Sequence, residues 1–262
     1  MKSTVFLGGG RITSALLAGL RLAGYDQPLV VHDRNPQKLR HLKRRYGVEV
    51  QGNVEKAVAG AKRLIVAARP DAVSELLREL QAFKMPAIGI SLAAGIPLSL
   101  LKRLAPSICW ARAMPSPVCR SCHGLTGLVF EPAFPQRQRR AIKQFFGKTG
   151  AVLEVPENQF DVFTVAYSSS HGYHALSALA QAAQDLGLDR GIAMTAAAHA
   201  LADGIQYFRD SKSGLPELLQ EATTPGGIAG TVMAAMESAG YGKAVKRGLQ
   251  AGLARARSNS RT

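Results

Sequence analysis

The chain has 262 residues, of which 47% are hydrophobic, and a formal net charge of +15. This length allows one or two domains with a sizeable core. The most apolar long segment, residues 191–208, contains His199, Asp203 and Gln206, so we predict a buried helix there and no membrane span. The first residues enter a short apolar segment without a stretch of signal-peptide length, and three cysteines form no disulfide framework. Both features predict a cytoplasmic protein.

The surplus positive charge lies in the first part of the chain. Residues 1–155 hold 24 Lys and Arg against nine Asp and Glu, whereas residues 156–262 are balanced. Five cations lie on one predicted helix, namely Lys38, Arg40, Lys43, Arg44 and Arg45. Such a helix can attract an anionic small ligand, bind nucleic acid, or simply be solvated. Because no zinc finger or RNA-binding signature accompanies it, we expect no nucleic-acid partner.

The first 155 residues alternate between apolar segments of strand length and segments of helical periodicity. Strands are expected at 4–7, 29–31, 64–67, 87–92, 108–113, 127–130 and 151–155, and helices at 12–22, from 36, from 71 and up to about 104. This alternation predicts βαβ crossovers and a doubly wound, Rossmann-type α/β sheet.

The pattern becomes helical after Pro156. Helices are expected over 160–186, with an interruption at 168–172, and over 190–209, 215–222, 228–239 and 243–257. We therefore predict a dinucleotide-binding domain over residues 1–155 and an all-helical dimerisation and substrate domain over residues 156–262. The second half is too apolar, with its long alanine-rich stretches, to stand alone in water, which favours a homodimer or a higher homo-oligomer.

A glycine-rich turn joins the first strand to the first helix. Its sequence is Gly8-Gly9-Gly10-Arg11-Ile12, followed by Thr13 where a third small residue is usual. Gly8 allows a tight turn, Gly10 lets a pyrophosphate approach the backbone, and the helix start supplies free N–H groups. Because the glycines lie between a strand and a helix, they indicate a dinucleotide-binding site much more specifically than the glycines alone would.

Two residues at the end of the second strand bear on the choice of cofactor. Asp33 can accept hydrogen bonds from the ribose 2′-hydroxyl of NAD, and Arg34 can pair with the 2′-phosphate of NADP. Arg34 and the local positive field favour NADP (as NADPH), while Asp33 keeps NAD as an alternative.

The segment Cys119-Arg120-Ser121-Cys122-His123 matches the C-x-x-C-H pattern of covalent haem attachment. Its cysteines also suggest a redox dithiol or part of a zinc site. No further ligand cluster accompanies them, so we predict no metal site and interpret the match as coincidence. A thiol pair that oxidises reversibly is the alternative.

Five segments together carry a family resemblance: GGGRI at 8–12, AARP at 67–70, SLAAGIPL at 91–98, RAMPSP at 112–117 and TTPGG at 223–227. In this order they resemble the pyrroline-5-carboxylate reductases, the final enzymes of proline synthesis. The resemblance implies hydride transfer from NAD(P)H to a cyclic C=N bond, with two helical domains intertwined in a dimer. The cofactor-binding residues it implies are Gly8, Gly10, Arg11, Ile12, Arg34, Ala68, Arg69, Pro70 and Ala93. A protonated imine is already electrophilic, so this chemistry needs no Ser/His/Asp triad and no metal.

The departures from the family pattern lie where the substrate is expected. The implied substrate-binding residues are Ser116, Ser170, Gly226, Gly227, Ile228 and Ala229, with Ser170 and His171 as candidate catalytic residues. Ser116 replaces an asparagine, and Ala229 replaces the hydroxyl expected to hydrogen-bond the imine nitrogen. Either a nearby side chain compensates, the candidates being His171, Tyr173, His174 and Thr231, or the substrate is a related cyclic imine. The alternative function is a catalytically inactive or regulatory nucleotide-binding paralogue.

Overall fold

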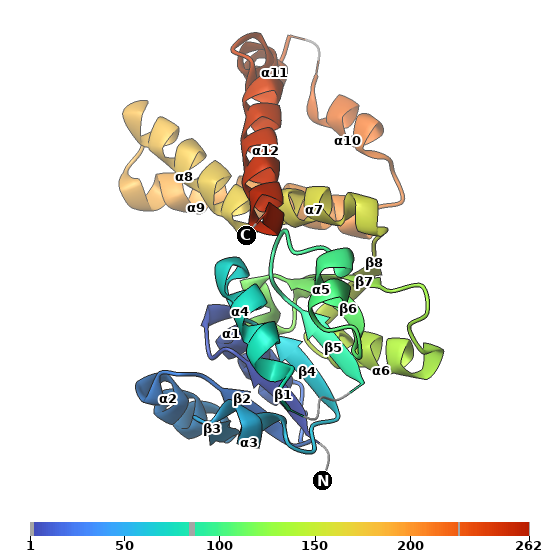
Figure 1. Cartoon of the computed structure of the whole chain (residues 1–262). Helices are drawn as coiled ribbons and strands as arrows, with labels where there is room; N and C mark the ends of the chain where they lie inside the picture. Colours follow the sequence, from blue (N-terminus) through green and yellow to red (C-terminus); the bar gives the residue numbers. More distant parts are fainter. Residues whose placement is uncertain (1–2, 84–86, 225, 262) are drawn as a thin grey trace. The chain divides into compact units, whose positions relative to one another are not determined.

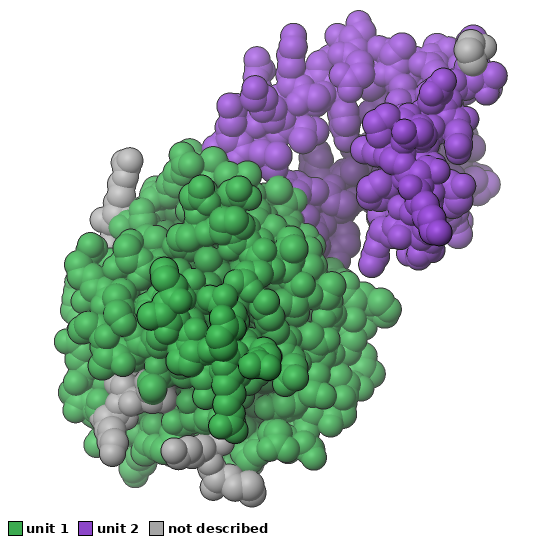
Figure 2. All heavy atoms as spheres, turned by 90° about the vertical axis from the view of Figure 1, so that its right-hand side faces the viewer, with its two compact units in different colours: residues 1–167, 251–262 green, residues 168–250 purple. Residues whose placement is uncertain are grey.

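The computed structural model describes residues 3–83, 87–224 and 226–261, and the chain forms two compact units (Figures 1 and 2). Unit 1 comprises residues 1–167 and 251–262, and unit 2 comprises residues 168–250. The chain therefore returns to unit 1 at its end. The domain division predicted at residues 155 and 156 falls between the last strand and the helix that follows it, and it stays a prediction.

Within the described residues, unit 1 contains an eight-stranded sheet in the order β3-β2-β1-β4-β5-β6-β7-β8. The strands are β1 (Thr4–Leu7), β2 (Leu29–His32), β3 (Glu49–Gln51), β4 (Arg63–Val66), β5 (Ile88–Ser91), β6 (Cys109–Pro115), β7 (Gly124–Phe130) and β8 (Gly150–Glu154). β1 pairs in parallel with β2 on one side and with β4 on the other, with Thr4 opposite both Leu29 and Arg63. The strand order reverses between β1 and β4, which is where doubly wound sheets bind ligands. The Rossmann-type prediction is confirmed.

The outer part of the sheet departs from the parallel pattern. β7 runs antiparallel to β6, and β8 is parallel to β7. The connection from β6 to β7 is only the short 3₁₀ helix η1 (Pro117–Ser121), and so short a link cannot carry the crossover that parallel strands require. The sequence did not predict β3, because only one of its three residues, Val50, is apolar.

Helices cover both faces of this sheet (Figure 1). One face packs against α1 (Arg11–Leu22), α2 (Pro36–Tyr46) and α6 (Gln136–Gly147). The other packs against α3 (Val54–Val58), α4 (Pro70–Leu80), α5 (Leu98–Leu104) and α7 (Glu157–Ala166). Neighbouring residues of β1 alternate between the two cores, with Phe6 in the first and Val5 and Leu7 in the second, as the two-residue period of a strand dictates. Each such buried side chain stabilises the fold by roughly 1.5–3 kcal/mol.

Unit 2 is helical, as predicted. It contains α8 (Ser169–Asp185), α9 (Arg190–Asp210), α10 (Leu215–Ala222), α11 (Ile228–Ser238) and the first part of α12 (Tyr241–Ser258). The interruption predicted at 168–172 is wrong in part: Ser168 caps α8 by accepting a hydrogen bond from the Ser170 N–H, and the residues after it form the first helical turn. Serine is a preferred N-cap, so the polar residues mark a helix start rather than a loop.

The helices of unit 2 bury little of their apolar surface within the chain. α8 and α9 pack against each other, yet their only fully buried residues among those described are Ala180, Ala193 and Ala197. Large exposed apolar side chains occur on every helix of the unit: Tyr173, Leu179, Ile192, Met194, Ile205, Tyr207, Phe208, Leu215, Leu219, Ile228, Val232, Met233, Met236, Tyr241 and Val245. Across the described ranges, no helix combines the length and the apolar character needed to cross a membrane.

A buried arginine attaches α7 to the sheet. The Arg112 side chain on β6 is 2% exposed, and its guanidinium donates to Glu157 Oε1 at 3.1 Å and to Asp161 Oδ1 at 2.7 Å. The same guanidinium lies 4.5 Å from the centroid of the Phe160 ring. All three partners are on α7. This single side chain therefore fixes the helix through charge, hydrogen bonds and ring stacking.

We expect Arg112→Ala to lower the free energy of unfolding by about 3 kcal/mol, because removing one partner of a buried ion pair leaves the other without compensation. Thermal unfolding followed by circular dichroism measures the change. Arg103→Ala, on the exposed face of α5, is the matched control and should leave the melting temperature within a few degrees. Equal losses in the two variants would contradict the anchoring role of Arg112.

Candidate cofactor and substrate site

The turn after β1 is built so tightly that only glycine fits at Gly8. Its φ is +114°, and an added Cβ would lie 2.6 Å from the carbonyl oxygen of Ala67 at the end of β4. The Gly8 N–H donates to the His32 carbonyl at 2.8 Å. Thr13, which departs from the expected small residue, is fully buried and donates its hydroxyl to the Gly8 carbonyl at 2.6 Å. The threonine therefore braces the turn.

Gly10 provides open space at the start of α1. It occupies the N-cap position without a side-chain cap, and an added Cβ would meet no described atom within 4 Å. The first-turn N–H groups of a helix lack intrahelical acceptors and form the positive end of its dipole. An uncapped helix start facing open space suits an anionic group such as a pyrophosphate.

The structure brings the predicted cofactor residues to one edge of the sheet. Gly8, Gly10, Arg11 and Ile12 follow β1, Arg34 follows β2, Ala68, Arg69 and Pro70 follow β4, and Ala93 follows β5. These four strands are parallel neighbours, so the segments after them share the carboxyl edge. Pro70 is the first residue of α4, and Arg69, its N-cap, is exposed and lies 3.7 Å from Asp71. The individual binding roles stay predictions.

Asp33 has a structural task that the sequence did not reveal. Its Oδ2 accepts a hydrogen bond from the Gly9 N–H at 2.8 Å, its Oδ1 accepts one from the Asn35 N–H at 2.8 Å, and Lys38 Nζ lies 3.6 Å away. The carboxylate therefore ties the glycine turn to the start of α2. Both of its oxygens already have backbone donors, which weakens the argument for Asp33 as a selector of NAD.

Arg34 is exposed and paired with α4. Its Nη2 lies 3.3 Å from Glu75 Oε1 and 3.3 Å from Glu79 Oε2. Hydrogen bonds to these two carboxylates raise the pKa of Arg34, so it is fully charged. Exposed ion pairs of this kind are weak. A phosphate can therefore replace the two glutamates as the partner of the guanidinium at a small cost in free energy.

The predicted substrate residues fall into separate segments. In unit 1, Ser116 is buried at the N-cap of η1, and its Oγ accepts a long hydrogen bond of 3.4 Å from the Val118 N–H. In unit 2, Ser170 and His171 are exposed in the first turn of α8, and the Ser170 hydroxyl lies 2.7 Å from that of Ser168. His171 therefore lies in a helix and not in the interruption predicted at 168–172.

The third segment is the start of α11. Gly226 has φ +74°, Gly227 is the N-cap, and Ile228 and Ala229 are exposed in the first turn. Pro225 of the same motif lies outside the described residues. The Thr231 hydroxyl donates to the Gly227 carbonyl at 3.1 Å. Like α1, this helix begins with glycine and has no side-chain cap, so its N–H groups can bind a carboxylate.

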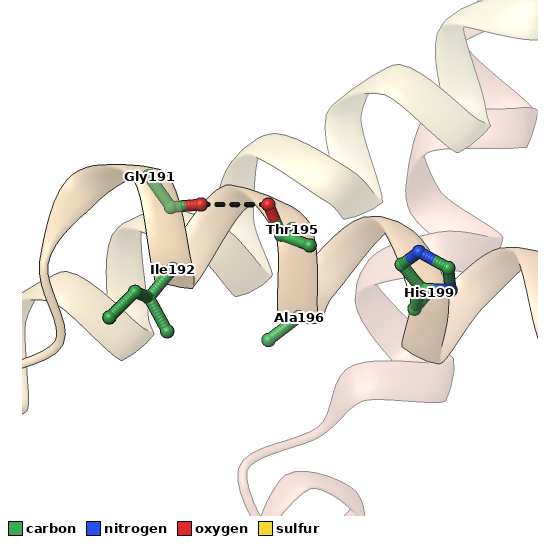
Figure 3. A pocket seen from close by; sticks show the side chains of 5 residues that line it. All are labelled: Gly191, Ile192, Thr195, Ala196 and His199. Carbon is green, nitrogen blue, oxygen red and sulfur yellow. Dashed lines mark hydrogen bonds between the residues drawn. The ribbon is translucent and has the colours of Figure 1, made fainter.

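A shallow hollow in unit 2 is lined by one face of α9 (Figure 3). Its lining consists of Gly191, Ile192, Thr195, Ala196 and His199. The Thr195 hydroxyl donates to the Gly191 carbonyl, and His199 Nδ1 lies 3.1 Å from Asp203 within the helix. All five residues come from a single helix, so the hollow is part of the exposed apolar surface and has no convergent polar groups for catalysis.

The C-x-x-C-H segment is explained by packing. Cys119 is fully buried, and burial raises the pKa of its thiol to about 12. The Cys122 backbone is left-handed, with φ +60°, and its thiol donates to the Gly19 carbonyl at 3.3 Å. A Cβ at Gly19 would overlap the Cys119 carbonyl oxygen. The segment thus folds as a turn pressed onto α1, and a protonated, buried Cys119 is a poor nucleophile or ligand at neutral pH.

Comparisons with known proteins agree with this geometry. Residues 3–95 match the family described as NADP oxidoreductase, coenzyme F420-dependent, and residues 157–259 match the pyrroline-5-carboxylate reductase dimerisation family. The pyrroline-5-carboxylate reductase of Mycobacterium leprae is 29% identical over 278 residues, covering 96% of this chain and 94% of the relative. That of Synechocystis is 26% identical over 249 residues, covering 94% and 93%.

Solved structures show the same fold. A pyrroline-5-carboxylate reductase from Coxiella burnetii has a TM-score of 0.87 at 24% identity, over 99% of this chain and 98% of its own. A Plasmodium falciparum pyrroline carboxylate reductase with NADP bound has a TM-score of 0.88 at 17% identity, over 99% and 98%. The fold and the carboxyl-edge site thus define a dinucleotide-binding protein with a helical dimerisation half. The chain is similar to the pyrroline-5-carboxylate reductases over nearly its whole length.

We expect Gly10→Ala to fold normally but to bind NADPH at least about tenfold more weakly. The methyl group meets no described atom, yet it would occupy the space where the pyrophosphate approaches, and lost charge-assisted hydrogen bonds cost roughly 1.5–3 kcal/mol. Nicotinamide fluorescence measures the affinity. Gly147→Ala, equally free of contacts, is the control. An unchanged affinity in Gly10→Ala would show that the pyrophosphate lies elsewhere.

Proposed function

We propose that the protein transfers a hydride from NADPH to the C=N bond of pyrroline-5-carboxylate or a closely related cyclic imine. The observation that carries this proposal is the match, over nearly the whole chain, to relatives that bear the name of this enzyme. None of these comparisons supports the alternative of an inactive or regulatory paralogue.

The cofactor half of the proposal assigns work to unit 1. The open helix start at Gly10, Arg11 and Ile12 takes the pyrophosphate, and Arg34 exchanges its two glutamates for the 2′-phosphate of NADPH. Ala68, Arg69 and Pro70 line the same edge, and Ala93 lies on the side toward the nicotinamide. NADPH supplies the hydride, and unit 1 orients it. The net positive charge of residues 1–155 attracts both the dinucleotide and an anionic substrate.

The substrate half needs orientation more than acid–base catalysis. A protonated imine is electrophilic by itself, so the protein has to hold its carbon near the transferred hydride and exclude water. The N–H groups at Ile228 and Ala229 suit the substrate carboxylate, because the Gly227 N–H already donates to the Thr224 carbonyl at 2.8 Å. The hydroxyls of Ser116 and Ser170 are the further polar candidates for substrate contact. His171, beside Ser170 in the first turn of α8, is a second candidate contact.

Thr231 can offset only part of the missing hydroxyl at Ala229, because residues two apart on a helix lie on different faces. Its hydroxyl hydrogen is directed to the Gly227 carbonyl, which leaves its oxygen lone pairs able to accept a hydrogen bond. A protonated imine nitrogen is a donor, so an acceptor is what it requires. Thr231 lies on the same helix as Ala229, two residues further on.

The assembly we propose is a homodimer formed through unit 2. This unit leaves large apolar side chains uncovered on each of its helices, and residues 157–259 match a dimerisation family. An apolar surface of this extent favours association with a second copy. The cytoplasm stays the predicted compartment.

The direct test follows NADPH absorbance with purified protein and pyrroline-5-carboxylate, alongside a panel of five- and six-membered cyclic imines. We expect turnover of at least one of them, with NADH a poorer donor than NADPH. The Gly10→Ala variant controls for contaminating reductases. Binding of NADPH without oxidation by any imine of the panel would contradict the proposed activity and favour the non-catalytic alternative.

We expect Ala229→Thr to raise kcat/KM for pyrroline-5-carboxylate by about tenfold, since a regained hydrogen bond to substrate is worth roughly 1 kcal/mol or more. Ala229 is exposed at the start of α11, so the larger side chain fits without repacking. Ala235→Thr carries the same helix-propensity cost on the same helix and should not change the rate. If Ala229→Thr fails to raise the rate, Thr231 or another group already supplies the contact.

A further inference from the structure

The loop at 92–97, which follows β5, is held by contacts from several distant segments. Within the loop, the Ala93 N–H donates to Ser91 Oγ at 3.3 Å. At its far end, the Leu98 N–H donates to Glu157 Oε1 at 2.9 Å, and that carboxylate is the one bound by Arg112. The loop is thus fastened where it meets β5 and where it enters α5.

The end of the chain contacts the middle of this loop. The side-chain amide of Asn259 donates from Nδ2 to the Ala94 carbonyl at 3.1 Å. Next to it, Gly95 has φ +75°, and an added Cβ would overlap the carbonyl oxygen of Ala256, which is itself buried. The last turns of α12 and the 3₁₀ helix η2 (Asn259–Arg261) therefore form one side of the loop's environment.

The C-terminal segment also contacts α4, the helix that follows β4 in the predicted cofactor site. η2 packs against α4, whose first turn follows β4 at the carboxyl edge (Figure 1, where C marks the end of the chain). Residues 251–262 accordingly belong to unit 1. In a doubly wound sheet with the adenosine side at β2, the second half of the dinucleotide lies over β4 and β5. The C-terminal segment thus contacts the 92–97 loop and α4, the two elements expected on the nicotinamide side.

We infer that Asn259 is a positioning residue for hydride transfer: by holding the Ala94 carbonyl, it fixes the 92–97 loop against which the nicotinamide is oriented. This inference rests on the proposed function. Asn259 is two-thirds of the chain away from the loop in sequence and contacts it through its side chain, so its role is to hold the backbone and not to touch the reacting atoms. A small displacement of an oriented reactant can cost up to about a hundredfold in rate.

The experiment compares Asn259→Asp and Asn259→Ala with the wild type. The aspartate keeps the shape but replaces the donor with a second acceptor facing the Ala94 carbonyl, and the alanine removes the side chain without adding charge. Ser260→Ala is the control, because the Ser260 hydroxyl bonds only to the Arg257 carbonyl of its own turn among the contacts described. We measure kcat, the KM for NADPH, the kinetic isotope effect with NADPH deuterated at the transferred position, and the melting temperature.

We expect kcat to fall about tenfold in both Asn259 variants, with a larger isotope effect on kcat as hydride transfer becomes rate-limiting. Ser260→Ala should match the wild type. A purely structural role would lower the amount of folded protein but leave the isotope effect unchanged, and that result would overturn the inference. An unchanged kcat and isotope effect in both variants would overturn it as well.

A second readout separates this inference from the proposed activity. NADPH affinity is measured by fluorescence without any imine, and we expect it to fall about threefold or more in Asn259→Asp, a loss of roughly 0.7 kcal/mol. If the wild type binds NADPH but reduces no imine, the proposed activity fails while the affinity comparison still tests the loop contact. Equal affinity in all variants would then overturn the role of Asn259.

Discussion

The close approach of two backbone segments, the turn after β1 and the end of β4, determines the geometry of the predicted cofactor site. Gly8 passes the end of β4 so closely that no side chain fits between it and the Ala67 carbonyl. That approach turns the chain directly from β1 into α1 and places the helix start, without a cap, at the carboxyl edge. Thr13 and Asp33 bind the turn from inside the fold, through the Gly8 carbonyl and the Gly9 N–H. Contacts within the chain therefore hold the helix start that we propose for the pyrophosphate, which lowers the ordering cost of binding.

Unit 1 and unit 2 differ in how far they bury their apolar side chains within the chain. The strands β1, β2, β4 and β5 are buried along their whole length, and helices on both faces complete two cores within one chain. In unit 2 the described helices bury almost only alanines, and the larger apolar side chains stay exposed. Such a unit gains stability mainly on association, so its folding and its assembly are linked by mass action. The residues predicted to contact substrate on α8 and α11 belong to this unit.

Local signals made most of this fold predictable, and long-range contacts account for what was missed. Four-residue apolar strands followed by helical periodicity identified β1, β2, β4 and β5 within one or two residues, because a buried parallel strand must be apolar throughout. β3 escaped notice since only one of its residues is apolar. The serines at 168–170 have the sequence character of a loop, because serine favours loops as well as helix N-caps. Gly9 lies 24 residues from Asp33, Asp161 lies 49 from Arg112 and Ala94 lies 165 from Asn259, and no local pattern encodes such pairs.

The changes in the substrate motifs are compatible with an active enzyme because the reaction asks little of any one side chain. A lost hydroxyl at Ala229 removes about 1–3 kcal/mol of transition-state stabilisation at most, whereas orientation of the two reactants can supply roughly 7–11 kcal/mol. The parts that provide orientation are intact: the glycine turn, the clamped 92–97 loop and the two uncapped helix starts. The parts that vary are single side chains at the predicted substrate positions. Divergence at Ser116, His171 and Ala229 therefore bears on which imine is preferred more than on whether hydride transfer occurs.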